Sequence, residues 1–249
     1  MRLHQCHVSD SLSIFRDGFL KRWELEPYTN PNLPALFVGA YNSVNDIKRI
    51  NDHKGFKLVL FGGADIPNVR MLNKGIHIVT DSFTYEHSLR RYLKLPYNYR
   101  FIRVAFKDYS DFNKVPLGSK IYCYQSQPTP ACQQKYGFDL LRVVIDYFGA
   151  ENVLVGYHGH TIKEMIDYYY SRSFVNLQLN PMAGFTTALE MAHMGRMTVS
   201  NHAAPFCLPF RSQAELIWQI KIVKEKSIEA DPSRFLHNSD DWLYTEYWN

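Results

Sequence analysis

The feature that most constrains the fold is a regular alternation of short apolar runs with amphipathic runs. ALFVGAY, residues 35–41, is almost entirely apolar, and the NSVNDIKRINDH that follows it repeats Val44, Ile47 and Ile50 at helical spacing. Strands that are apolar on both faces are typical of a parallel sheet covered on each side by helices. The alternation of such strands with helices therefore predicts an α/β fold.

The alternation occurs in two blocks. The first block has predicted strands at 35–41, 56–65, 75–82 and 99–106 and helices at 42–53 and 84–95. The second block has predicted strands at 120–126, 152–159, 173–180 and 196–201 and helices at 133–149, 161–172, 186–195 and 212–226. Between them, KDYSDFNKVPLGS at 107–119 is polar, contains Pro116 and Gly118, and is typical of a linker. We therefore expect two Rossmann-like βαβ domains facing a cleft, one at 1–110 and one at 119–249.

The composition is that of a folded, soluble protein. Hydrophobic residues make up 46% of the chain and charged residues 21%, which permits a packed core and argues against extensive disorder. No apolar run approaches the roughly 20 residues of a membrane-spanning helix, so we expect no transmembrane segment. The N-terminal MRLHQCHVSD is too polar for a secretory signal. These features predict a cytoplasmic protein, and its net charge of +4 suits a phosphate-rich ligand.

Several common catalytic motifs are missing from the sequence. The four cysteines form no C-x-x-C pair, which favours reduced structural thiols. His158 and His160 have no third ligand at a suitable spacing, so we expect loop residues rather than a metal site. GGAD and GYHGH are not phosphate-binding P-loops, and no G-x-S-x-G motif is present. The sequence thus predicts no metal site and disfavours a phosphotransferase or a hydrolase.

The segment NPMAGFTTALEMAHMGRMTVSN, residues 180–201, joins a strand to a helix through a glycine-containing turn. The first amides of a helix have no intrahelical partner and carry partial positive charge, so they suit a phosphate. Gly184 would let the backbone approach closely, and Thr186 and Thr187 would add hydroxyl donors. Glu190 follows them by four and three residues, so all three share one helix face. This face predicts a nucleotide site, with phosphate on the amides and ribose on the carboxylate.

A purely structural role for the same segment is the alternative. TALE also fits a capping box, in which Thr187 caps the helix and Glu190 reaches back to its backbone amide. Such a box needs no ligand. The local pattern leaves these two interpretations open.

The wider order of elements resembles that of GT-B glycosyltransferases, in particular the retaining group with an E-x7-E signature. In that group a loop of the type P-S-x-x-E-G-F-G-L runs into L-E-A-M-A-x-G-x-P-V-V, and here Pro181 precedes GFTTALEMAHMGRMTVS. The resemblance covers about 35–225, with its specific part at 174–201. It implies that Glu190 binds the donor ribose, while Met182 stands where the family has its first glutamate. The residues that it places against the donor diphosphate are Gly184, Phe185, Thr186 and Thr187.

The resemblance also implies donor contacts elsewhere in the second half. KIYCYQ, which ends at Gln125, stands where the family places the phosphate-contacting start of its C-terminal domain. NVLVGYHG, with Tyr157 and His158, fits the strand and loop that contact the base. For the family's basic residue after the first strand, we prefer Lys135 to Arg142, because Arg142 is expected on an outer helix face.

In the same family the N-terminal half binds the acceptor. The candidate acceptor-binding residues here are Tyr41 and Asn42 in GAYNS, and Asp81 and Tyr85 in DSFTYEH. The resemblance also lets His87 contact the donor sugar from across the cleft. His87 and Lys135 are thus the two candidate catalytic residues.

The resemblance implies a glycosyltransferase that moves a hexose with retention from a nucleotide-diphosphate sugar, a UDP-sugar by preference, without a bound cofactor. Its acceptor stays open between a glycan or lipid-linked sugar and a hydroxymethylated base in DNA. The chain is short for this architecture, and compact versions suit viral or phage enzymes, which act in the host cytoplasm. The basic RRYLKLPYNYRFIR, residues 90–103, would suit a DNA backbone. The alternative is a non-catalytic nucleotide- or nucleic-acid-binding protein on the same scaffold.

Overall fold

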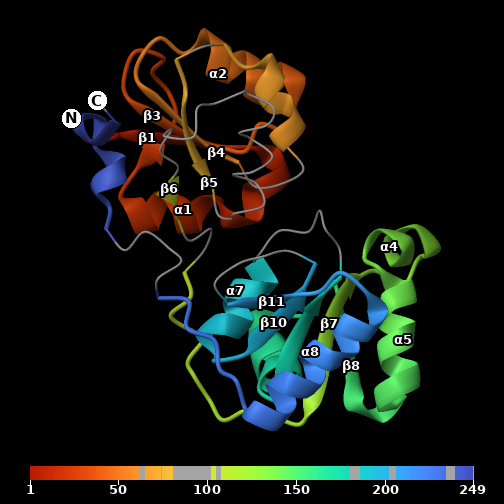
Figure 1. The fold of residues 1–249 in the computed structure, drawn as a ribbon. Helices are drawn as coiled ribbons and strands as arrows, with labels where there is room; N and C mark the ends of the chain where they lie inside the picture. Colours follow the sequence, from red (N-terminus) through yellow and green to blue (C-terminus); the bar gives the residue numbers. More distant parts are fainter. Residues whose placement is uncertain are drawn as a thin grey trace. The chain divides into compact units, whose positions relative to one another are not determined.

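The computed structural model divides the chain into two compact units (Figure 1). One unit consists of Met1–Asp108 together with Leu236–Asn249, and the other of Tyr109–Phe235. The residues that the structure describes are 1–61, 65–73, 75–80, 102–104, 108–179, 186–201, 206–233 and 239–248.

The first unit is built on a parallel sheet of six strands. These are β1 (Gln5–Val8), β2 (Glu26–Pro27), β3 (Ala35–Val38), β4 (Lys57–Phe61), β5 (His77–Thr80) and β6 (Ile102–Arg103). Their order across the sheet is β2-β1-β3-β4-β5-β6, and every neighbouring pair is parallel. This is a doubly wound order, in which the direction of winding reverses between β1 and β3.

Helical segments cover both faces of this first sheet. They are η1 (Asp10–Phe15), α1 (Arg16–Trp23), η2 (Ser43–Ile47), α2 (Lys48–Asp52), η3 (Ile66–Met71), η6 (Asp241–Leu243) and η7 (Thr245–Trp248). Alternate residues of β3 point to opposite faces: Leu36 packs in the cluster that contains Trp23 of α1, and Phe37 in the cluster that contains Ile50 of α2. Each face of the sheet therefore has its own apolar core.

The end of the chain belongs to the first unit. The Trp242 ring meets the Trp23 ring edge to face, with 5.1 Å between centroids, and the Leu3 amide donates to the Leu243 carbonyl at 2.8 Å. Because these side chains are buried in the α1 core, the terminal segment is part of the first unit. The sequence-based division, which kept 119–249 together, needs this correction.

The second unit is a parallel sheet of five strands. These are β7 (Lys120–Ser126), β8 (Val153–Tyr157), β9 (Ser173–Gln178), β10 (Met197–Ser200) and β11 (Cys207–Pro209). Their order is β11-β10-β9-β7-β8, with all neighbours parallel. Counted from β7, this is the 2-1-3-4-5 order of doubly wound proteins, so the winding reverses between β7 and β9.

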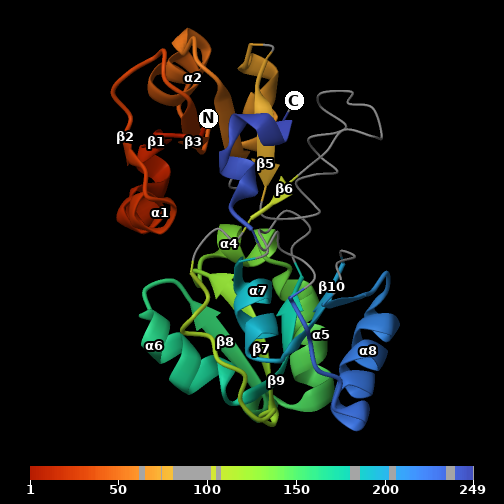
Figure 2. The same cartoon turned by 90° about the vertical axis from the view of Figure 1, so that its left-hand side faces the viewer.

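The helical segments of the second unit lie on both faces of its sheet. They are α4 (Pro130–Lys135), α5 (Phe138–Phe148), η4 (Ala150–Asn152), α6 (Ile162–Glu164), η5 (Met165–Tyr170), α7 (Thr186–His193) and α8 (Gln213–Lys226). Residues of α5 and α8 share one apolar core with β7 and β9. Figure 2 shows α7 in front of β7 and β9, and α6 beside β8.

These two sheets confirm the predicted α/β class with two Rossmann-like units. The predicted strand at 120–126 is β7, and the predicted helix at 212–226 is α8 with its cap, Ser212. The predicted helix at 133–149 is wrong in one respect, because Gly137 adopts φ of 72° and separates α4 from α5. A cleft between the units stays a prediction.

Candidate functional site

The carboxyl ends of β7 and β8 are joined by backbone hydrogen bonds at the carboxyl edge of the second sheet. Ser126 pairs with Tyr157 across a bulge, and its backbone is left-handed with φ of 60°. Its carbonyl accepts a hydrogen bond from the His158 amide at 2.6 Å. Since open α/β sheets bind ligands beyond the carboxyl ends of their strands, this edge is the candidate site. It brings together the expected donor-binding positions Gln125, Tyr157 and His158.

Gln125 points into the protein at the end of β7. Its side chain is buried, and Nε2 donates to the Tyr136 carbonyl at 3.2 Å. Its Oε1 is also buried and has no hydrogen-bond partner among the residues that the structure describes. An unsatisfied buried acceptor costs about 1–3 kcal/mol. A hydrogen-bond donor placed beside Oε1 would therefore be stabilising.

Helix α7 begins at the same edge, after the switch-point strand β9. Thr186 and Thr187 are its first two residues, and both side chains are partly exposed. Its first amides and the helix dipole favour an anion in front of it. The predicted helix is therefore present from Thr186 onward in the described residues, and its contact with a diphosphate stays a prediction.

Glu190 is held in place by the hydroxyl of Tyr170. The Tyr170 hydroxyl donates to Oε2 of Glu190. The Thr187 side chain also forms a hydrogen bond with Tyr170. Burial, followed by the charge of Glu190, raises the pKa of Tyr170 well above its usual value, so the phenol stays protonated. Thr187 and Glu190 thus share one helix face, as predicted. The alternative capping box, with Thr187 as the cap, does not fit, because Thr187 already lies within the described helix.

Tyrosine rings fill the space between α7, η5 and β7. The Tyr122 ring meets the Tyr170 ring edge to face at 5.3 Å and the Tyr169 ring at 5.7 Å. The Tyr122 hydroxyl is buried without a hydrogen-bond partner in the described part of the chain. It lies against Gly156 of β8, where any Cβ would collide with it. Burial raises the pKa of Tyr122 well above its usual value.

The candidate basic residues lie in the helices after β7. Lys135 is the last residue of α4, and its side chain is outside the described part of the structure. Arg142 is exposed on α5, opposite the buried Leu141 and Val144, so its predicted place on an outer face is confirmed. The candidates that lie outside the described residues altogether are Asp81, Tyr85, His87, Gly184 and Phe185.

In the first unit, Tyr41 and Asn42 follow β3 and organise the start of η2. Their amides donate to Oδ2 of Asp46 at 3.1 and 2.9 Å. Oδ1 of Asn42 accepts hydrogen bonds from the amides of Val44 and Asn45 at 2.8 and 3.2 Å. The Asn42 side chain therefore has a helix-capping role in this structure. An acceptor contact from it stays a prediction.

Sequence reasoning missed a polar cluster around Asp46. Nε2 of His7 lies 2.9 Å from Oδ1 of Asp46, and Oγ of Ser9 donates to Oδ2 at 2.6 Å. Nη1 of Arg49 donates to Nδ1 of His7 at 2.8 Å. The signal that was available is the alternation of polar and apolar residues in QCHV, which is typical of a strand.

Within the described ranges, no group of three or more His, Cys, Asp or Glu side chains could hold a metal ion. Nε2 of His160 lies instead 3.0 Å from the Tyr169 hydroxyl. Of the helices in the described part of the chain, none is both long enough and apolar enough to span a membrane.

Comparison with known proteins gives structural similarities alone. No protein-family model matches the chain, and no curated protein matches it. The Glycosylation Associate Protein (Gap123) complex from Streptococcus agalactiae is similar over 88% of this chain, with 12% identity and a TM-score of 0.41. The sucrose-phosphate synthase from Thermosynechococcus elongatus is similar over 86%, with 12% identity and a TM-score of 0.47. The chain spans 53% of the first matched chain and 68% of the second, and its fold class rests on its own two sheets.

Proposed function

We propose that this protein is a glycosyltransferase that moves a sugar from a nucleotide-diphosphate sugar to an acceptor. The observation that carries the proposal is helix α7, which follows β9 next to the switch between β7 and β9 and has Thr186 and Thr187 ahead of Glu190. A helix N-terminus stabilises a diphosphate, and a carboxylate one turn further on suits ribose hydroxyls. The sequence resemblance to GT-B enzymes supports the same assignment.

In this proposal the protein works by positioning and by charge stabilisation. The α7 amides and the hydroxyls of Thr186 and Thr187 stabilise the leaving diphosphate as charge develops on it. Glu190, fixed by Tyr170, orients the ribose. The ends of β7 and β8, at Gln125 and Tyr157, face the nucleotide. Lys135 and His87 are proposed to act on the diphosphate and the donor sugar.

The finer assignments rest on the resemblance. They are a UDP-sugar as donor, retention at the anomeric carbon, no bound cofactor, and a cytoplasmic location, in the host cytoplasm if the enzyme is viral. The acceptor is proposed to be a glycan or lipid-linked sugar, or a hydroxymethylated base in DNA that would have to flip out of the duplex.

A turnover assay tests the proposal. Release of nucleotide diphosphate is measured from UDP-, GDP-, ADP- and dTDP-sugars, with and without hydroxymethylated DNA, for the wild type and for Glu190→Ala. Release from one donor that is lost in the variant supports the transferase. Stimulation by the DNA identifies the acceptor class.

The second candidate is a non-catalytic nucleotide- or nucleic-acid-binding protein. It is favoured by Met182, which replaces the first glutamate of the E-x7-E pattern. The same assay separates the two functions, because a binding protein holds the nucleotide sugar without splitting it.

A further inference from the structure

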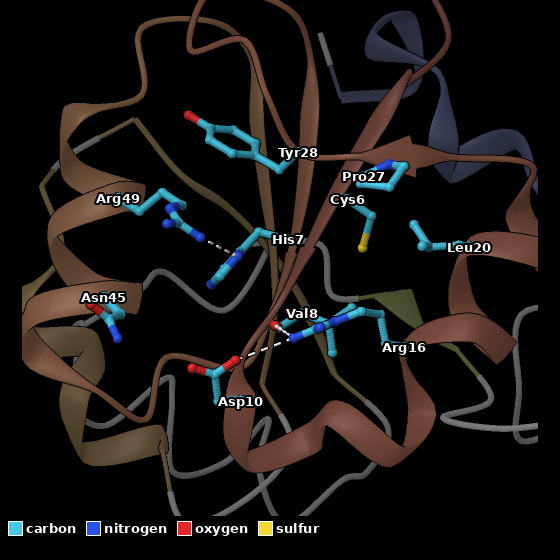
Figure 3. A pocket seen from close by; sticks show the side chains of 10 residues that line it. All are labelled: Cys6, His7, Val8, Asp10, Arg16, Leu20, Pro27, Tyr28, Asn45 and Arg49. Atoms are coloured by element: carbon cyan, nitrogen blue, oxygen red, sulfur yellow. Dashed lines mark hydrogen bonds and ion pairs between the residues drawn. The ribbon is translucent and has the colours of Figure 1, made fainter.

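A pocket of about 350 Å³ opens beside the carboxyl end of β1 in the first unit (Figure 3). The elements that line it are β1, η1 with Asp10, the end of β2 with the adjoining Tyr28, α1 and the η2–α2 segment, so it lies next to the point where this sheet reverses its winding. Arg16 of α1 and Arg49 of α2 stand on opposite sides of His7 (Figure 3). Its size is that of a small-molecule site.

His7 is fixed in one tautomer at the centre of this pocket. Arg49 can only donate, so its 2.8 Å contact makes Nδ1 of His7 an acceptor. The ring proton then lies on Nε2 and is donated to Asp46 at 2.9 Å. Burial lowers the pKa of His7, against the opposing effect of the Asp46 hydrogen bond, and this agrees with a neutral ring. His7 therefore orients Arg49 without neutralising its charge.

The charge of Asp46 is stabilised by hydrogen bonds, and its carboxylate does not line the pocket. Ser9, His7 and the amides of Tyr41 and Asn42 all donate to its carboxylate. Although burial would raise the pKa of Asp46, these hydrogen bonds hold it below its usual value. Asp46 lies 2% exposed and is absent from the pocket lining. It fixes the position of His7 and leaves Arg49 facing the pocket.

Among the described residues, the two guanidinium groups keep donors for a ligand. The Cζ atom of Arg49 lies over the Tyr28 ring, 5.8 Å from its centroid, and Nη1 donates a hydrogen bond to His7. Arg16 uses Nη2 alone within the described residues, on the Val8 carbonyl at 3.4 Å and on Asp10 at 3.2 Å. The Asp10 side chain is 83% exposed, so this ion pair is weak and easily exchanged.

We propose that this pocket binds an oxyanion, either the phosphate or the carboxylate group of a small polar molecule. A planar guanidinium pairs with such a group through two parallel N–H bonds, and Arg16 and Arg49 line this pocket from opposite sides of His7. The Asn45 side chain adds a neutral polar contact, and the Cys6 thiol is uncharged because burial raises its pKa. The site stands independently of the proposed function.

Calorimetric titration tests this proposal on the full chain. The probes are inorganic phosphate, glucose 6-phosphate, glucuronate and, as the uncharged control, glucose. We expect the wild type to bind a charged probe and not glucose. Arg16→Gln and Arg49→Gln should each weaken binding by about tenfold or more, because each removes charge-assisted hydrogen bonds. The relative affinities for glucose 6-phosphate and glucuronate identify the anion as phosphate or carboxylate.

Matched controls remove the same charge from the same helices outside the pocket. Lys21→Gln on α1 and Lys48→Gln on α2 should bind as the wild type does. The proposal is overturned if no charged probe binds, or if the lysine variants lose as much affinity as the arginine variants. If one arginine variant fails to fold, the other decides. UDP binding to the same variants is measured in parallel, so failure at this pocket is distinguished from failure of the proposed nucleotide site.

Discussion

The Tyr170 hydroxyl donates a hydrogen bond to the carboxylate of Glu190, twenty residues further along the chain. Tyr170 is the last residue of η5, and Glu190 lies on α7. Both side chains are buried, with 1% and 8% of their surface exposed. The bond therefore fixes the orientation of the Glu190 side chain, the carboxylate that we propose for the ribose.

Removal of this hydroxyl should destabilise the protein. We expect Tyr170→Phe to lower the free energy of unfolding by about 1–3 kcal/mol, because it removes a charge-assisted hydrogen bond from a buried carboxylate. Urea denaturation measures the loss. Tyr122→Phe is the matched control, since the Tyr122 hydroxyl is buried without a partner among the described residues. Its removal should cost less than about 0.5 kcal/mol or stabilise the protein. Equal losses for the two variants would contradict this assignment.

Arg196 should be among the most sensitive positions of the second unit. It is fully buried just before β10, and within the described residues its guanidinium donates to backbone carbonyls, including those of Val115 and Pro116 at 2.7 and 2.6 Å and Ser173 at 3.2 Å. A lysine keeps the charge but cannot reach the same carbonyls with its compact head group. We expect Arg196→Lys to cost more than about 3 kcal/mol, measured by urea denaturation. Arg211→Lys, at an exposed position, should leave the free energy of unfolding unchanged. An Arg196→Lys protein as stable as the wild type would show that the planar guanidinium of Arg196 is not required.

Gly118 should not accept a side chain. A Cβ there would fall on the backbone of Arg172, and the Gly118 amide donates to the Ser173 carbonyl at 3.1 Å. We expect Gly118→Ala to lower the thermal midpoint strongly, with a loss of more than about 2 kcal/mol. Gly18→Ala on the exposed face of α1 meets no neighbour within 4 Å and should stabilise the protein by about 0.5–1 kcal/mol. A Gly118→Ala protein as stable as the wild type would refute this close approach.

Stability should fall on mild acidification, and His7 should contribute to the fall. Burial lowers the pKa of His7 from 6.5 in the folded protein, so below that pH the unfolded chain binds more protons. Its contribution is lost as the pH falls from 6.5 towards the folded pKa and changes no further below it. The free energy of unfolding, measured between about pH 7.5 and 5, should decrease less for His7→Gln than for the wild type. Parallel pH profiles would contradict the buried neutral imidazole.

The strands that could be predicted are those with continuous apolar runs. ALFV and KLVLF are buried on both faces and form β3 and β4, as their apolar runs predict. Their alternation with helices predicts the α/β class. β1 could not be recognised in the same way. Its Gln5 is buried because the amide donates to the Leu33 carbonyl at 3.2 Å and accepts from the Thr29 amide at 2.9 Å. Hydrogen bonds that satisfy a buried polar side chain are invisible in a hydropathy pattern.

The candidate site could be predicted only as far as local order along the chain allows. The helix start at Thr186 and the shared face of Thr187 and Glu190 follow from spacing. The Tyr170 contact does not, because the run YYY in η5 gives no sign of which ring faces α7. The inward turn of Gln125 depends likewise on the Tyr136 carbonyl, which another element supplies.

The most direct test of the central claim is calorimetric binding of UDP, GDP, ADP and dTDP to the wild type, to Glu190→Ala and to the exposed control Glu225→Ala. We predict that at least one diphosphate binds the wild type and the control equally, and that Glu190→Ala weakens it by about tenfold or more. Hydrogen exchange in the bound state should slow at the ends of β7 and β8 and at the start of α7. Absence of binding to all four nucleotides, or equal binding by Glu190→Ala, would contradict a nucleotide site at this edge of the sheet.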